Sequence, residues 1–206
     1  MITFSNNKWI DVKNAMFLFL LLASHLDNCL SAQVTLAGET YDTVHFNGLT
    51  WMAQNLNYEI ADSWCYDNNP ANCLKYGRLY TWEAAMRACR EVGMRLPTDN
   101  EWIELAMSHG GFSNFMYDKD HEDEGDPKKA YEALIEGGNS GFTAQLGGGR
   151  LSLGLFNRLG EYGGYWSATE LDAGNAWRFD FNRISGRLYR RDLNKPAGLS
   201  CRCVKD

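Results

Sequence analysis

The segment TWEAAMRACREVGMRLPTDNEWIELAMSHGG, residues 81–111, contains two helix signals in succession. Apolar residues recur at helical spacing after Thr81, at Trp82, Ala85, Met86 and Cys89. This spacing predicts a helix whose Cys89 faces the core. Thr98 and Glu101 predict the start of a second helix, because together they form a capping box that satisfies two unpaired backbone N–H groups.

The residues upstream of this segment predict a hairpin and a loop. Apolar residues alternate on both sides of Asn47-Gly48, a dipeptide that favours the positive φ angles of a tight turn between antiparallel strands. Residues 61–74 are rich in Asp, Asn and Pro, which predicts an irregular loop. Cys65 and Cys73 bracket that loop, so we expect a disulfide between them.

Downstream, residues 112–165 lose regular periodicity and are rich in glycine. We expect a long irregular region there, with one short helix over residues 130–135. Long irregular segments of compact domains commonly carry function. We therefore expect ligand contacts in this region.

The C-terminal residues predict a sheet with one buried face. Trp177, Phe179 and Phe181 alternate with polar residues, and a turn at Ser185-Gly186 separates them from a second strand. A final strand follows over residues 199–203. Antiparallel strands, two helices and a long irregular loop region define an α+β domain.

The first residues predict export. An apolar run, AMFLFLLLA at residues 15–23, follows two lysines and precedes the small residues Ser31 and Ala32. The run is shorter than the roughly 20 apolar residues that a transmembrane helix needs, but it fits a secretory signal. We expect a signal peptide over residues 1–32 and a single mature domain over residues 33–206, secreted or at the cell surface.

A lipid anchor at Cys29 is a weaker alternative to secretion, because Asp27 and Asn28 occupy positions where a lipoprotein signal requires small residues. Apart from such an anchor, no membrane attachment is expected. Removal of the leader leaves five cysteines: Cys65, Cys73, Cys89, Cys201 and Cys203. In an oxidising compartment this odd number predicts two disulfides and one free thiol. The net charge of the chain, −6, argues against a nucleic-acid partner.

Five separated motifs stand out along the chain: GLTWMAQNLNYE (48–59), CYDNNPANCLKYGRLYTWEAA (65–85), RLPTDNEWIEL (95–105), GYWSATE (164–170) and RCVKD (202–206). They closely resemble motifs of the Fibrobacter succinogenes major paralogous domain family. The motifs occur in family order and cover nearly all of the mature chain. The resemblance therefore extends over the whole expected domain.

The resemblance implies an exported bacterial protein with a C-type lectin-like fold, which is also the fold of the formylglycine-generating enzymes. It further implies a disulfide between Cys89 and Cys203. Cys201 stands where the family usually has an apolar residue, so which of Cys201 and Cys203 pairs with Cys89 remains open. The family has no settled biochemical activity, and fold similarity alone does not assign one.

An acidic run at residues 118–126 is a candidate calcium site. Oxygen ligands suit calcium, and the candidate ligands are Asp118, Asp120, Glu122 and Asp123. The spacing matches neither a helix-loop-helix calcium loop nor the calcium signatures of C-type lectins. A solvated acidic loop is therefore the favoured interpretation, and no cofactor is expected.

The C-terminal strands are rich in arginine although the whole chain is acidic. Arginine and aromatic side chains together suit an anionic or sugar ligand through bidentate hydrogen bonds and stacking. The candidate ligand-binding residues are Trp166, Arg178, Arg187, Tyr189 and Arg190. Ordinary surface charge is the alternative interpretation.

These observations favour an exported, non-catalytic binding module for a polysaccharide or a surface protein, with exposed aromatic side chains in the long loop region. A structural subunit of a surface assembly is the alternative, and it predicts an apolar edge or a partner-donated strand. A copper-dependent formylglycine-forming oxidase is a third possibility. That enzyme class predicts that Cys201 and Cys203 form an accessible pair.

Overall fold

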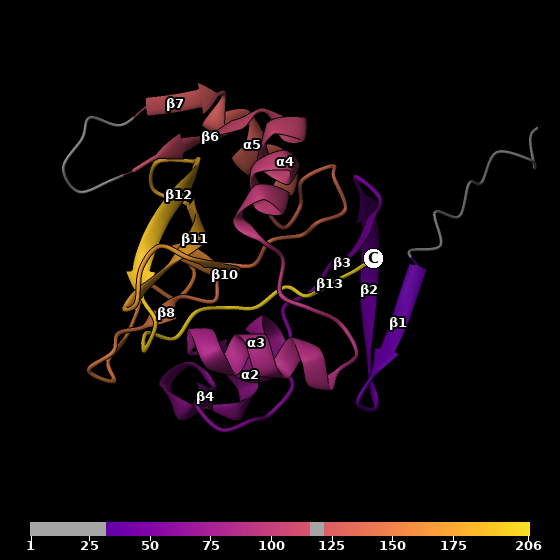
Figure 1. The fold of residues 1–206 in the computed structure, drawn as a ribbon, viewed down its shortest axis with the longest axis vertical. Helices are drawn as coiled ribbons and strands as arrows, with labels where there is room; N and C mark the ends of the chain where they lie inside the picture. The colour runs from indigo at the N-terminus through magenta and orange to yellow at the C-terminus, as the bar shows by residue number, and fades with distance from the viewer. Residues whose placement is uncertain (1–31, 116–121) are drawn as a thin grey trace, which may run out of the picture. The chain divides into compact units, whose positions relative to one another are not determined.

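The computed structural model of the chain describes residues 32–115 and 122–206, which form two main sheets with helices between them (Figure 1). The expected leader lies outside the described residues apart from Ala32, with which the first strand begins. Among the residues that the structure describes, no helix is long and apolar enough to span a membrane.

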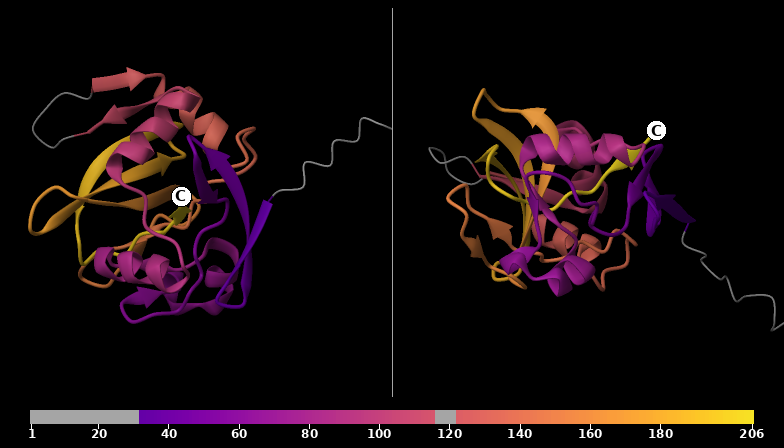
Figure 2. Two further views of the ribbon diagram at one scale, coloured as in Figure 1. Left: turned by 45° about the vertical axis from the view of Figure 1, so that its right-hand side comes forward. Right: turned by 90° about the horizontal axis from the view of Figure 1, so that it is seen from below.

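The smaller main sheet has the strand order β1-β2-β3-β13. Its strands are β1 (Ala32–Leu36), β2 (Glu39–Phe46), β3 (Leu49–Met52) and β13 (Val204–Lys205). Asn47 and Gly48 join β2 to β3 with φ angles of 48° and 79°, which confirms the predicted turn. β13 pairs antiparallel with β3, with Val204 opposite Trp51, so the C-terminus lies beside a strand from the start of the domain (Figure 2).

The larger main sheet has the order β10-β11-β12-β6-β7. Its strands are β6 (Gly111–Asn114), β7 (Glu122–Gly125), β10 (Tyr162–Glu170), β11 (Asn175–Asn182) and β12 (Arg187–Asn194). Neighbouring strands are antiparallel except β12 and β6, which run parallel with Tyr189 opposite Ser113. The protein is therefore an α+β domain with predominantly antiparallel strands.

Both predicted helices are present. Thr81 caps α3 (Trp82–Glu91) by accepting a hydrogen bond from the backbone N–H of Ala84. Thr98 and Glu101 form the predicted capping box at the start of α4 (Asp99–His109). The short helix expected near residue 130 is also confirmed, as α5 (Pro127–Leu134).

Two segments contain more regular structure than the sequence predicts. The region expected as an irregular loop at residues 61–74 contains β4 (Ser63–Trp64), the short 3₁₀ helix η1 (Tyr66–Asn68) and the start of α2 (Pro70–Tyr76), which is followed by β5 (Leu79–Tyr80). Asn69 caps α2 and Pro70 occupies its first turn, a favourable pair for starting a helix. The glycine-rich region also contains the hairpin β8 (Gly149–Arg150) and β9 (Phe156–Asn157).

Buried apolar residues form two clusters. One surrounds α3 and includes Cys89, Trp166 and Cys203. The other lies between β3, the helices α4 and α5, and the larger sheet. In this second cluster Trp102 stacks on Phe179 with ring centroids 5.3 Å apart. Phe179 and Phe181 of β11 are buried as predicted, and α4 and α5 cover their face. Trp177 is only half-buried, and Asp180 on the opposite face is buried as well, so burial does not alternate along the whole strand.

Two disulfides connect the chain, as expected. Cys65, which lies between β4 and η1, is bonded to Cys73 of α2, and Cys89 of α3 is bonded to Cys203 before β13. Cys201 is a fully buried free thiol whose Sγ atom lies 3.2 Å from that of Cys89. The partner of Cys89, which the sequence left open between Cys201 and Cys203, is therefore Cys203.

Candidate functional site

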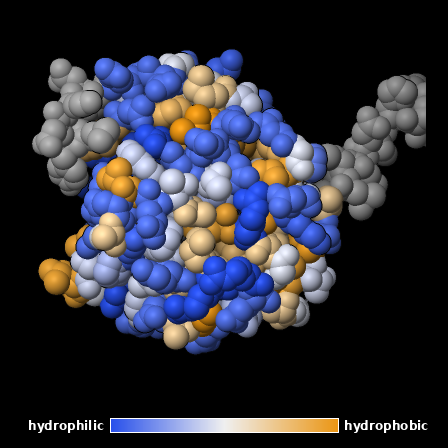
Figure 3. Space-filling model, viewed as in Figure 1, coloured by the Kyte–Doolittle hydropathy of each residue, from blue (hydrophilic) through white to orange (hydrophobic). Residues whose placement is uncertain are grey.

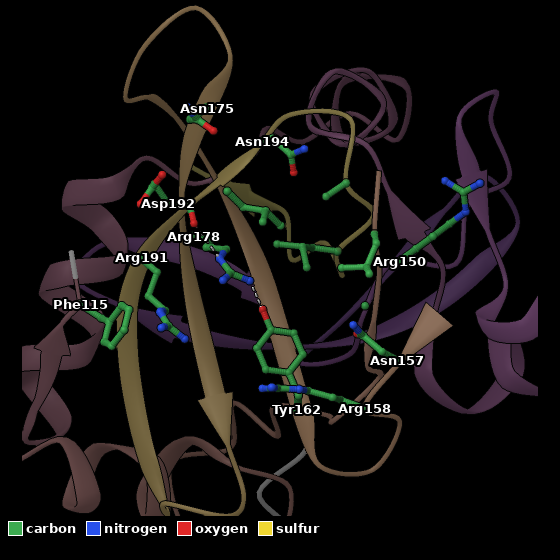
Figure 4. Close-up of a pocket in the computed structure, with 15 residues that line it drawn as sticks. Phe115, Arg150, Asn157, Arg158, Tyr162, Asn175, Arg178, Arg191, Asp192 and Asn194 are labelled. Carbon is green, nitrogen blue, oxygen red and sulfur yellow. Dashed lines mark hydrogen bonds between the residues drawn. The ribbon is translucent and has the colours of Figure 1, made fainter. Parts of the chain in front are cut away.

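The larger sheet presents two different faces. Phe179 and Phe181 lie on the face that α4 and α5 cover. Arg178 and Arg191 are opposite each other across β11 and β12, and side-chain alternation places them on the other face. A cavity of about 450 Å³ lies over this second face, with Tyr162 of β10 in its lining and the β8–β9 hairpin along its far side (Figure 4).

The lining of this cavity is polar and basic. It includes four arginines, Arg150, Arg158, Arg178 and Arg191, and three asparagines, Asn157, Asn175 and Asn194. Asp192 is the acidic residue in the lining. Asp192 lies opposite Trp177, so alternation directs its side chain to the other face of the sheet, while its backbone carbonyl accepts a hydrogen bond of 3.3 Å from Arg178 Nε.

A buried network of three side chains lies beneath the cavity. The Tyr162 hydroxyl donates to Asp180 Oδ1 at 2.6 Å and accepts a hydrogen bond from Arg178 Nη1. Arg178 Nη2 lies 3.2 Å from Asp180 Oδ2. Burial raises the pKa of Tyr162 well above its usual value, so this phenol stays protonated at neutral pH and fixes the orientation of the Arg178 guanidinium.

One arginine pairs with the Asp180 carboxylate, and two further arginines of the cavity lining influence its ionisation. Burial raises the pKa of Asp180, and the charges of Arg178, Arg191 and Arg158 oppose that rise. Asp180 forms an ion pair with Arg178, whereas the guanidinium groups of Arg158 and Arg191 form no ion pair with the described residues. The cavity therefore has an excess of positive charge.

Aromatic rings position two of the cavity arginines. Arg191 Cζ lies 3.6 Å from the centroid of the Phe115 ring. Arg150 Cζ lies 3.8 Å from the centroid of the Trp64 ring, and the backbone of Arg150 pairs with Gly198. Stacking and backbone pairing restrict both side chains, so a ligand would meet partly ordered guanidinium groups.

The prediction that Trp166 contacts a ligand is wrong. Its side chain is fully buried against the α3 cluster, and its indole N–H donates to the Tyr80 carbonyl at 2.8 Å. Trp166 shares the cavity face of the sheet with Arg178, but α3 and the C-terminal segment cover this end of that face. Burial of this large apolar ring stabilises the core instead.

Of the other predicted ligand-binding residues, only Arg178 lines the cavity. Arg187 forms an ion pair with Asp123 of β7 at 3.0 Å. Arg190 makes a bidentate ion pair with Asp99 at the start of α4 and stacks on Trp177, so it braces the sheet against that helix. Tyr189 is half-buried and lies outside the cavity lining.

The candidate calcium ligands are only partly described. Asp118 and Asp120 lie outside the described residues, and Glu122 and Asp123 are exposed on β7. Asp123 already forms an ion pair with Arg187. The calcium site stays a prediction.

Sulfur atoms gather at a second place in the fold. The Sγ atoms of Cys89, Cys201 and Cys203 lie within 4.8 Å of one another and are buried. The accessible pair that a copper oxidase requires at Cys201 and Cys203 is absent from the structure, because Cys203 is bonded to Cys89 and the Cys201 thiol is buried. Burial also raises the pKa of this thiol, which disfavours the reactive thiolate.

Comparison with known proteins now assigns the chain to a family. The model of the Fibrobacter succinogenes major domain matches residues 44–205. The chain belongs to the Fibrobacter succinogenes major domain family. A search of curated proteins found no match. Every residue that lines the cavity lies inside the matched segment, so the cavity is part of the Fibrobacter succinogenes major domain itself.

The sequence did not single out most of the residues that line this cavity. Arg150, Asn157 and Arg158 come from the glycine-rich region, where ligand contacts were expected but no individual residue stood out. Arg191 belongs to the arginine-rich strand, and its pairing with Arg178 across β11 and β12 depends on strand register. The sequence shows that arginines are frequent near the C-terminus, but only the three-dimensional fold shows which of them meet in the cavity.

Proposed function

We propose that this domain is an exported, non-catalytic binding module, and that the cavity over the larger sheet holds part of a polysaccharide. Its volume of about 450 Å³ falls within the range of small-ligand sites, roughly 300–1,000 Å³. Such a space accommodates a chain end or a few sugar units rather than the surface of a folded protein.

Two features support action outside the cytoplasm. The domain has two disulfides, which form and persist mainly in oxidising compartments. The sequence also begins with a basic segment and an apolar run that together fit a secretory signal. Both features support the proposal that the domain is secreted or displayed at the cell surface.

The observation that carries the sugar assignment is the combination of amide, guanidinium and aromatic groups in one cavity. Each asparagine side chain offers both hydrogen-bond donors and an acceptor, as sugar hydroxyls do. Among residues 32–115 and 122–206, the side-chain amides of Asn157 and Asn194 form no hydrogen bond, so both are available to a ligand. Phe115 and Tyr162 supply apolar surface beside them.

Screening the purified domain on a glycan array, with and without calcium, tests the proposal. We expect specific binding that the double variant Asn157→Ala/Asn194→Ala weakens at least tenfold, because two ligand hydrogen bonds are lost. Asn139→Ala is the matched control, since Asn139 is exposed and lies away from the cavity. Absence of binding to every glycan would contradict the proposal, and calcium dependence would revive the predicted calcium site.

A structural role in a surface assembly is the second candidate, and one observation favours it. The turn between β8 and β9 exposes Leu153 and Leu155, whose side chains are 90% and 65% exposed. The space-filling view shows apolar residues projecting at lower left, where Figure 1 places this turn (Figure 3). A binding module was expected to expose aromatic side chains in the glycine-rich region. Among the described residues of that region, the exposed large apolar side chains are leucines instead.

Sedimentation measurements distinguish this role from a monomeric binding module. If the turn mediates self-assembly, the wild-type domain forms oligomers and Leu153→Ser/Leu155→Ser shifts them to monomer. Leu74→Ser is the control, because Leu74 is equally exposed but lies on α2. A monomeric wild-type domain would remove self-assembly as a role for this turn.

A further inference from the structure

The charge of the cavity differs from the charge of the chain. The whole chain has a net charge of −6, yet the described residues that line the cavity include four arginines and one aspartate, and strand alternation places that aspartate's side chain on the opposite face. A concave site with low-dielectric walls concentrates the field of such charges. An anion is therefore attracted to this place on an otherwise acidic protein.

Among the residues that the structure describes, Arg178 is the one cavity arginine with an ion pair. Arg178 shares its charge with the buried Asp180, which also accepts the Tyr162 hydrogen bond. Arg158 and Arg191 line the same cavity and form no ion pair with any described residue. Their charges remain available to a ligand, and Phe115 holds the Arg191 guanidinium in place by stacking.

The backbone of Arg158 makes one substitution at this position informative. Arg158 has a φ angle of 59°, in the left-handed region that glycine adopts without strain. A bulky residue in this region costs roughly 1–2 kcal/mol, and such strain is concentrated at ligand sites. Glycine would adopt this backbone conformation without strain, so Arg158→Gly removes the guanidinium group without disturbing the backbone.

We propose that the ligand is an acidic polysaccharide, with a uronate carboxylate or a sulfate group held between Arg158 and Arg191. This inference rests on the proposed function and specifies the chemistry of its ligand. Guanidinium groups bind carboxylate and sulfate through charge-assisted hydrogen bonds, while the neighbouring Asn157 and Asn194 suit the hydroxyl groups of the same sugar.

Isothermal titration calorimetry with matched oligosaccharides tests the inference. The probes are oligogalacturonate with its carboxyl-reduced neutral counterpart, and chondroitin sulfate with its desulfated counterpart. The first pair reports on a carboxylate, and the second reports on a sulfate group. We expect the acidic member of at least one pair to bind at least tenfold more tightly than its neutral partner, with affinity falling as salt rises.

Variants of the arginines locate the contact. Arg158→Gly and Arg191→Gln should each weaken binding of the acidic probe about tenfold. Arg158→Gly also relieves the backbone strain, so its thermal unfolding temperature should equal or exceed that of the wild type. Arg90→Gln is the matched control, because Arg90 is exposed on α3 and outside the cavity, and its affinity should stay unchanged.

Failure of this inference differs from failure of the proposed function. Equal affinity for acidic and neutral members of each pair, or full affinity in both arginine variants, overturns the acidic assignment and leaves a neutral sugar as ligand. Binding of polyglutamate without binding of any oligosaccharide overturns it in favour of an acidic peptide. Absence of binding to every oligosaccharide contradicts the proposed function itself.

Discussion

At the scale of single residues, Arg202 connects the C-terminal segment to two other parts of the chain. Its guanidinium is fully buried and donates to four oxygens, the carbonyls of Met52, Phe142 and Thr143 and Oδ1 of Asn55. Burial lowers the pKa of Arg202, although this side chain remains protonated. Arg202 is therefore a core residue, although the arginine-rich composition of the C-terminal residues alone suggests surface charge.

Replacement of Arg202 by methionine should destabilise the domain by about 3 kcal/mol or more. The substitution keeps much of the apolar volume, but it leaves several buried carbonyl oxygens without a donor, each costing roughly 1–3 kcal/mol. Urea unfolding measures the change. Arg187→Met is the control, because it removes a partly exposed ion pair worth up to about 1 kcal/mol. An equal loss in both variants would contradict the role of Arg202.

The position of Cys201 leads to a second prediction at this scale. In Cys203→Ala, we expect Cys89 to form a disulfide with Cys201, because their Sγ atoms already lie 3.2 Å apart. Mass spectrometry of unreduced peptides identifies the new pair. In the wild type, Cys201 should resist alkylation until denaturant is added, since its thiol is buried and its pKa is raised by that burial. Rapid labelling of the native protein would contradict this.

At the scale of elements, the start of α4 is tied to the end of the chain. Arg95 makes a bidentate ion pair with Glu101, the capping-box residue, and a second ion pair with Asp206. Burial acts to raise the pKa of Glu101, but hydrogen bonds from Arg95 and Thr98 outweigh it, so the pKa is lowered overall. The ionised carboxylate therefore stabilises the folded state.

Glu101→Gln should cost about 1 kcal/mol of stability at neutral pH through the weakened cap and ion pair. Because the pKa of Glu101 is lower in the folded state, its contribution is fully present above the ordinary value of 4.5 and is lost as pH falls through the folded value. The difference in unfolding free energy between wild type and variant should therefore shrink below about pH 4.5. Urea unfolding from pH 7 to pH 3 measures it, and a constant difference would contradict the assignment.

Elements with local signals could be predicted from the sequence, whereas the cavity could not. The Asn47-Gly48 turn and the Thr98 capping box depend on adjacent residues and are confirmed. Trp166 was misassigned because alternation gives the two faces of a strand but not which parts of each face other elements cover. Arg158 was missed because its neighbours in space come from β11 and β12, far along the chain.

At the scale of the whole described domain, the two disulfides close loops of very different length. Cys65 and Cys73 are 8 residues apart in sequence, whereas Cys89 and Cys203 are 114 apart. Because a longer loop loses more conformational entropy on closure, the second disulfide restricts the unfolded chain more. It also joins α3 to the segment that carries Arg202 and β13.

Cys89→Ala should therefore destabilise the domain more than Cys65→Ala/Cys73→Ala. The chain-entropy relation gives about 4–5 kcal/mol for the long loop and about 2–3 kcal/mol for the short one. Cys89→Ala is the informative variant, because it deprives both Cys201 and Cys203 of this partner. Thermal and urea unfolding of the two variants provide the comparison. A larger loss from the short loop would indicate that packing around α2 outweighs loop entropy.

The placement of β13 beside β3 determines when the domain becomes complete during synthesis. Residues 199–205 supply a strand to the smaller sheet, a cysteine to the long disulfide and apolar side chains to both clusters. These residues leave the ribosome after all the other elements of the domain. A chain that emerges from its N-terminal end therefore cannot pair β13 with β3, or form the long disulfide, until the last residues of the domain have emerged.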